Sequence, residues 1–123
     1  IDRGDLSKDV KIESIPIIQR NLFNIKKNLN NKRIFVATNL LESMLENNFP
    51  TRGEVNDIFN SLEMGADGLV LASETAIGKY PQDAVKLLQK MIKAFRKSKY
   101  KNPQRFRRVE KIHGFSRKCL LSY

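Results

Sequence analysis

Residues 33–44, with the sequence RIFVATNLLESM, decide the fold of this 123-residue chain. The four apolar residues 34–37 are typical of a strand buried on both faces, and Thr38 begins the polar stretch that ends it. A second apolar run at 68–72 is also followed by polar side chains, at residues 73–75. Each predicted strand therefore ends where a polar site can begin.

Helical patterns flank both predicted strands. Apolar residues recur at helical spacing over 15–29, Thr51 and Glu54 form a capping box for a helix that Gly65 ends, and Pro81 opens a third helix. The apolar positions predicted to face the core are Ile15, Ile18, Leu22, Ile25, Leu29, Val55, Ile58, Leu62, Val85, Leu88, Ile92 and Phe95. Alternating helices and strands predict the α/β class, with parallel strands and helices on both faces of the sheet. In such folds, ligands bind beyond the carboxyl ends of the strands.

The charge of the chain is distributed unevenly. Residues 1–92 hold twelve basic and twelve acidic side chains, whereas residues 93–123 hold eleven basic side chains and one acidic one, so the net charge of +10 lies at the C-terminal end. This shift predicts a folded domain over residues 1–95 and a basic tail over residues 96–123. Aromatic residues among the cations of the tail are compatible with nucleic-acid binding, but its aperiodic sequence favours poor order instead.

Three features indicate the cellular setting. No run of about 18 apolar residues is present to span a membrane. A single cysteine, Cys119, cannot form an internal disulfide, which fits a reducing compartment. The chain begins with Ile1 rather than Met and has no secretion-signal pattern, so we expect a cytoplasmic piece of a longer protein.

The N-terminal segment carries groups suited to phosphate chemistry. Arg3 supplies a cation, Gly4 lets backbone amides approach an anion closely, and Asp5 offers the hard oxygen ligand that Mg²⁺ or Mn²⁺ prefers. Phosphoryl or enolate chemistry requires these three kinds of group. The structural alternatives are that Asp5 only forms a turn and that Thr38 only caps the short helix that follows it.

Four segments of the chain resemble motifs of the pyruvate kinase family, in the same order and at similar spacing. They are 3–7 (RGDLS, for RGDLG in the family), 37–44 (ATNLLESM, for ATQMLESM), 50–54 (PTRGE, for PTRAE) and 64–81 (which contains MGAD, LASETAIG and YP). Because four motifs agree in order, coincidence is a poor explanation. The resemblance covers residues 1–95.

The resemblance implies a (β/α)₈ barrel, of which this chain forms an incomplete part, about three of the eight βα units. It also implies transfer of a phosphoryl group between phosphoenolpyruvate and ADP, giving pyruvate and ATP in glycolysis, with Mg²⁺ or Mn²⁺ and usually K⁺. The family segment that carries a catalytic lysine and a metal-binding glutamate is not in this chain. We therefore expect the chain to be inactive alone and to require the missing barrel half or another copy of itself.

The same resemblance implies roles for five residues. Asp5 is similar in position to the metal ligand of the family. The backbone amides of Gly4 and Asp5, with Arg3 beside them, are expected to bind the substrate carboxylate. Thr38 is expected to contact that carboxylate and to be catalytic. Glu74 is expected in a polar cluster that routes a proton through water during catalysis.

Several positions depart from the family pattern. Asp2 stands where the family prefers a small residue, and we expect it to face outward or to line the site. Ala72 replaces a serine of the proton relay, and Ile77 replaces a lysine. These differences favour an alternative function, in which the chain is a catalytically inactive, truncated homologue that serves as a binding or scaffold module. Nucleic-acid binding through the basic tail is one form of that alternative.

Two further residues look functional but have a simpler explanation. Arg52 and Asp57 belong to the helix that follows the PTRGE segment. Charged residues at such positions form structural ion pairs more often than they contact substrate. We therefore expect both to stabilise the fold.

Overall fold

The computed structural model describes residues 1–29 and 31–101. Its elements in chain order are α1 (Arg3–Asp9), η1 (Ile12–Ser14), α2 (Ile15–Lys26), β1 (Phe35–Ala37), η2 (Glu42–Leu45), α3 (Arg52–Met64), β2 (Gly68–Val70), α4 (Ser73–Ala76) and α5 (Pro81–Lys101). Most of the predicted basic tail, residues 102–123, lies outside the described residues.

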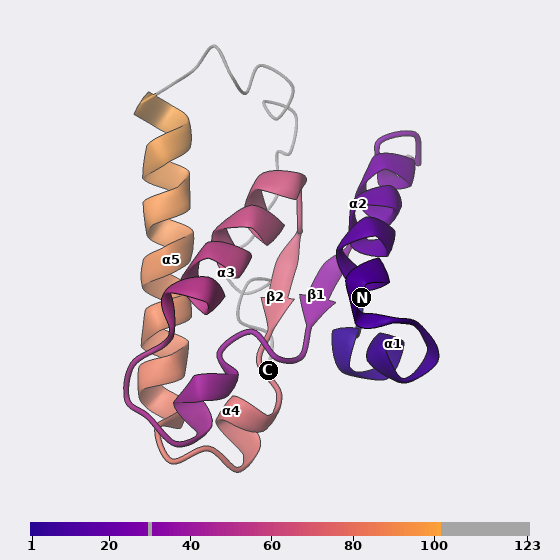
Figure 1. Cartoon of the computed structure of the whole chain (residues 1–123). Coiled ribbons are helices and arrows are strands. Elements are labelled where there is room, and N and C mark those ends of the chain that lie inside the picture. The colour runs from indigo at the N-terminus through magenta and orange to yellow at the C-terminus, as the bar shows by residue number, and fades with distance from the viewer. Residues whose placement is uncertain (30, 102–123) are drawn as a thin grey trace.

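The sheet is parallel. Phe35 of β1 pairs with Gly68 of β2, and Figure 1 shows both strands pointing the same way. The first residues of the chain extend this arrangement, because Asp2 forms a parallel bridge with Ala37 and the Ala37 N–H donates to the Ile1 carbonyl at 2.9 Å. The predicted parallel pairing is confirmed. As a result, the carboxyl ends of three consecutive segments meet at one edge of the sheet.

The hydrophobic core lies between the sheet and helices α3 and α5. Val36 of β1 and Leu69 of β2 are buried, and they belong to one apolar cluster with Ile58 of α3 and Leu88 of α5. Figure 1 shows α3 and α5 on the side of β2 and α2 on the side of β1. Leu40, just after β1, is fully buried as well. The core therefore anchors the loop that leaves β1, which is where the predicted site begins.

Helix α3 forms as its sequence predicts. The Thr51 side chain accepts a hydrogen bond from the Glu54 N–H, and the Glu54 carboxylate accepts one from the Thr51 N–H, which completes the capping box. The helix ends at Gly65, whose φ of 106° is left-handed. Glycine adopts this conformation without the steric cost that other residues incur. Local chemistry therefore sets both ends of α3.

The predicted inward face of α2 is only partly buried: Ile15 and Ile18 are half-buried, but the rest of the predicted face is exposed. Leu22, Ile25 and Leu29 are 37%, 54% and 49% exposed, respectively. The buried residues of α2 are Gln19 and Phe23, on a different face of the helix. Leu22, Ile25 and Leu29 remain exposed, so helical periodicity identified the amphipathic helix but not which of its faces the described residues cover.

Helix α5 is amphipathic over its described side chains. Leu88, Ile92 and Phe95 are buried as predicted. The helix spans 21 residues and continues across the predicted boundary at residues 95 and 96 to Lys101. Its outer face is polar, and within the described parts of the chain no helix has the length and apolar character needed to cross a membrane.

Candidate functional site

The structure brings the N-terminal RGDL segment to the end of β1. The Gly4 N–H donates a hydrogen bond to the Thr38 hydroxyl oxygen at 2.8 Å, although 34 positions separate the two residues. Space around Gly4 is limited, because a Cβ atom added there would lie 3.3 Å from Thr38 Oγ1. The N-terminal segment and the end of β1 therefore meet at the same end of the sheet, and a ligand held between Asp5 and Thr38 stays a prediction.

The turn after β1 has an unusual backbone. Thr38 and Asn39 have φ angles of 66° and 53°, which are left-handed and uncommon for residues other than glycine. Arg3 holds this turn, because its Nη2 donates to the Thr38 and Asn39 carbonyls at 3.1 Å each. Its Nη1 contacts Asp57 Oδ2 at 2.5 Å. An arginine and an aspartate from distant segments therefore support the backbone that presents the Thr38 hydroxyl.

Arg3 has little left to offer a ligand. The Arg3 side chain is 13% exposed. Three of its five N–H groups donate to Asp57, Thr38 and Asn39, and its Nε is buried and has no acceptor among the described residues. The geometry therefore gives Arg3 a positioning role, and a direct contact between Arg3 and substrate stays a prediction.

Asp2 lines the same mouth. Its Oδ1 accepts a hydrogen bond from the Asp5 N–H at 3.1 Å and lies 3.0 Å from the Thr38 hydroxyl oxygen, which also lies 2.7 Å from the Ala37 carbonyl. The Asp5 N–H, and after it the Thr38 hydroxyl, hold the pKa of Asp2 below its ordinary value of 3.8. Asp2 is therefore an anion in contact with both halves of the candidate site.

Asp5 is the predicted metal ligand. Its side chain is 72% exposed, and its Oδ1 contacts Lys8 Nζ at 2.7 Å. Within the described residues, no cluster of three or more His, Cys, Asp or Glu side chains is placed to hold a metal ion. Asp5 can therefore serve as one ligand of an ion such as Mg²⁺, but the described residues do not form a complete site by themselves.

Glu74 is buried, with an exposed fraction of 2%. Its Oε1 accepts from the Leu41 N–H at 3.0 Å, and its Oε2 accepts from the Ala72 N–H at 2.9 Å. One carboxylate thus ties the loop after β1 to the loop after β2. This is a positioning contact between the two strand ends, and the catalytic role of Glu74 stays a prediction.

Sequence patterns did not predict that Ser43 would bond Glu54 or that Asp57 would pair with Arg3. Ser43 donates from its N–H to Glu54 Oε1 at 2.7 Å and from its hydroxyl to Glu54 Oε2 at 2.5 Å. Partial burial raises the pKa of Glu54, but the hydrogen bonds from Ser43 and Thr51 outweigh burial, and the resulting pKa lies below 4.5. The Thr-x-x-Glu pattern identified Glu54, whereas no local signal marked its distant partner.

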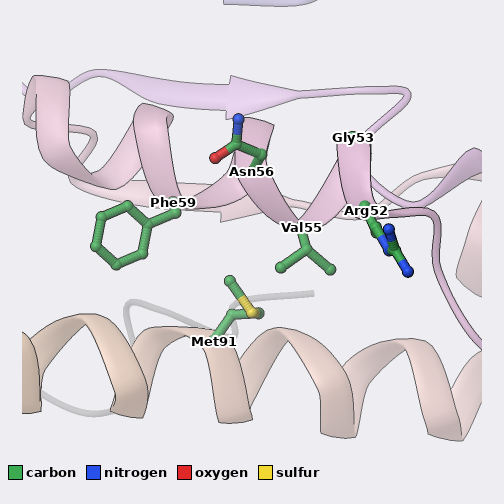
Figure 2. Close-up of a pocket in the computed structure, with 6 residues that line it drawn as sticks. All are labelled: Arg52, Gly53, Val55, Asn56, Phe59 and Met91. Atoms are coloured by element: carbon green, nitrogen blue, oxygen red, sulfur yellow. The ribbon is translucent and has the colours of Figure 1, made fainter.

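A pocket of about 620 Å³ lies elsewhere, between α3 and α5. Figure 2 shows Val55 and Phe59 of α3 pointing toward Met91 of α5, with Arg52 at one end. No salt bridge joins Arg52 to another described residue. Asp57, on the same helix, pairs with Arg3. This pocket has none of the residues that the sequence placed at the strand ends.

A comparison with protein families decides the assignment. The family model described as "Pyruvate kinase, barrel domain" matches residues 1–85. The chain belongs to the pyruvate kinase family. The resemblance seen in its motifs is thereby confirmed, and its helices and parallel strands correspond to part of the pyruvate kinase barrel domain.

Individual relatives agree with this assignment. Pyruvate kinases of Thermotoga maritima and Methanocaldococcus jannaschii are each 48% identical to this chain over 93 residues, which is 76% of the chain but only 20% and 21% of those proteins. The crystal structure of pyruvate kinase from Pyrobaculum aerophilum is similar with a TM-score of 0.73 and 41% identity, over 76% of this chain and 22% of that one. The chain therefore spans about a fifth of the length of the pyruvate kinases it matches.

Proposed function

We propose that this chain forms part of the phosphoenolpyruvate site of a pyruvate kinase and acts in phosphoryl transfer only when the rest of a barrel is supplied. The hydrogen bond from the Gly4 N–H to Thr38 Oγ1 at 2.8 Å carries the proposal. This contact supports a shared site because it joins the two motifs that resemble the carboxylate-binding groups of the family. Membership of the family supports the chemistry, since the relatives are pyruvate kinases.

The described architecture supports three βα units. The first comprises the N-terminal segment with α2, the second β1 with α3, and the third β2 with α5. A complete barrel of this kind has eight such units. The proposal is therefore an incomplete barrel whose two open edges pair either with the missing barrel half or with another copy of this chain.

We assign the roles by position. The Gly4 and Asp5 amides and the Thr38 hydroxyl are proposed to bind the substrate carboxylate, with Arg3 supporting the turn that holds Thr38. Glu74 is proposed to hold the two strand-end loops in register during catalysis, because its carboxylate accepts hydrogen bonds from both. Preorganised donors of this kind stabilise charge that develops in a transition state.

The proposed cofactors are Mg²⁺ or Mn²⁺ and K⁺. Asp5 fits as one ligand of the divalent ion because its carboxylate is exposed. Such an ion, when bound, offsets negative charge on phosphate and enolate oxygens. K⁺ enters the proposal from the family resemblance alone, as do ADP and ATP as nucleotide partners and a cytoplasmic location.

Thermal unfolding of the full chain with Mn²⁺, with and without phosphoenolpyruvate, tests this proposal. A ligand present at 100 times its Kd stabilises the folded state by about 2.7 kcal/mol, so binding raises Tm measurably. Asp5→Ala is expected to abolish the Mn²⁺-dependent part of the rise. Asp9→Ala is the matched control, because Asp9 is also exposed on α1. The enzyme assignment fails if neither ligand stabilises the chain and Asp5→Ala changes nothing.

A second candidate function is a catalytically inactive homologue that binds partners. Two contacts favour it: Asp5 is paired with Lys8, and Asp2 Oδ1 lies 3.0 Å from the Thr38 hydroxyl oxygen. Nucleic acid is one proposed partner, and exposed cations continue along α5 at Lys86, Lys90, Lys93, Arg96 and Lys97. Salt-dependent RNA binding without any response to Mn²⁺ or phosphoenolpyruvate supports this second function.

A further inference from the structure

We propose that Asp2 is a built-in carboxylate that competes with the carboxylate of the substrate for the Asp5 N–H and the Thr38 hydroxyl, and so makes the site autoinhibited. The inference rests on the proposed function, because it concerns regulation of the same site. It differs from that function in naming a residue that weakens binding rather than one that supports it.

The first argument is that the proposed ligand-binding groups already have partners. The Gly4 N–H donates to Thr38 Oγ1, and the Asp5 N–H donates to Asp2 Oδ1 at 3.1 Å. The Thr38 hydroxyl oxygen lies 3.0 Å from the same Asp2 oxygen. A substrate carboxylate that binds to the Asp5 N–H and the Thr38 hydroxyl must therefore displace Asp2.

The second argument is that helix capping does not account for all the contacts of Asp2. As the N-cap of α1, Asp2 needs only the hydrogen bond from the Asp5 N–H. Its contact with Thr38 crosses to a segment 36 positions away, at the end of β1. One carboxylate oxygen thus meets a backbone amide of one segment and a hydroxyl of another, which are the groups proposed for the substrate.

The third argument concerns charge. A second carboxylate placed at these donors lies within a few ångströms of the first, and like charges at that distance repel each other. Asp2 is exposed, so its side chain can turn into water when it is displaced. The contact therefore weakens substrate binding without closing the site permanently.

The experiment measures the Kd of phosphoenolpyruvate in the presence of Mn²⁺, by isothermal titration calorimetry on the full chain. Asp2→Ala removes the competing carboxylate. Asp2→Ser removes the charge but keeps a residue that caps helices well, so it guards against loss of α1. Asp9→Ala changes the net charge equally without touching Thr38. Circular dichroism confirms that each variant is folded.

Both Asp2 variants are expected to bind phosphoenolpyruvate at least about tenfold more tightly than the unaltered chain, because a hydrogen-bonded, charged competitor has been removed. Asp9→Ala is expected to bind as the unaltered chain does. The inference is overturned if binding is measurable and both Asp2 variants leave it unchanged. If no variant binds phosphoenolpyruvate at all, the inference falls together with the proposed function.

Discussion

Arg3 and Asp57 form an ion pair across 54 positions of the sequence, with Nη1 and Oδ2 at 2.5 Å. The same guanidinium donates to the carbonyls of Thr38 and Asn39, two consecutive residues in the left-handed region. Asp57 on α3 therefore holds the Arg3 guanidinium in place, and the guanidinium stabilises the backbone at Thr38 and Asn39.

Removing the acid of this pair is expected to loosen the Thr38 turn. Asp57→Asn leaves the partly buried guanidinium without its counter-charge, and we expect a loss of about 1–3 kcal/mol in the free energy of unfolding. Urea denaturation measures it, with Asp83→Asn on α5 as an exposed acidic control. An unchanged midpoint for Asp57→Asn shows that the pair does not support the fold.

Replacing the Glu74 carboxylate by the isosteric amide of glutamine is expected to destabilise the fold. In Glu74→Gln, the side-chain NH₂ faces either the buried Leu41 N–H or the partly buried Ala72 N–H, so one backbone donor loses its acceptor. We expect a loss of about 2–3 kcal/mol in the free energy of unfolding, measured by urea denaturation. Glu63→Gln, at an exposed position on α3, is the control. Equal stability of both variants argues that the Glu74 hydrogen bonds to the two strand-end loops do not stabilise the fold.

Acid is expected to weaken the contact between Ser43 and Glu54. The pKa of Glu54 is lower in the folded chain than its ordinary value of 4.5, so ionised Glu54 stabilises the fold above that pH. This contribution is lost as the pH falls below 4.5 and through the folded pKa. Urea denaturation between pH 6 and pH 3 measures it, in steps of about half a pH unit. Glu54→Gln is expected to show a shallower pH dependence, and an identical slope contradicts the assignment.

The apolar stripe of α2 is expected to cause association. Leu22 and Ile25 are 37% and 54% exposed, and among the described residues no strand pairs with the outer edge of β2 or with the outer edge of the N-terminal segment that bridges β1. Burying such surface is favourable by about 25 cal/mol per Å². Gel filtration with light scattering is expected to show a species larger than one 14.2 kDa chain, and Leu22→Glu combined with Ile25→Glu is expected to shift it toward the monomer. A compact, stable monomer of the unaltered chain contradicts the prediction.

Local sequence patterns were sufficient to predict most of the helices and strands. The residues that begin and end α3 act within a few positions of each other: Thr51 bonds Glu54, and Gly65 takes a conformation that other residues avoid. The buried side of α5 followed from its helical spacing, and the parallel pairing of β1 and β2 followed from the helix between them. The same reasoning failed for α2, because periodicity marks an apolar face without specifying a partner for it.

The sequence by itself determined the family of this protein and its parallel strands, because motif order and strand polarity are properties of the chain. Only the tertiary structure showed that the Gly4 N–H donates to Thr38. Only the tertiary structure decided that Arg3 supports the Thr38 turn through Asp57 and that Glu74 is buried between two loops. It also decided that Asp2 contacts Thr38. These contacts join residues more than 30 positions apart, or depend on which way a side chain turns, and no local pattern specifies either.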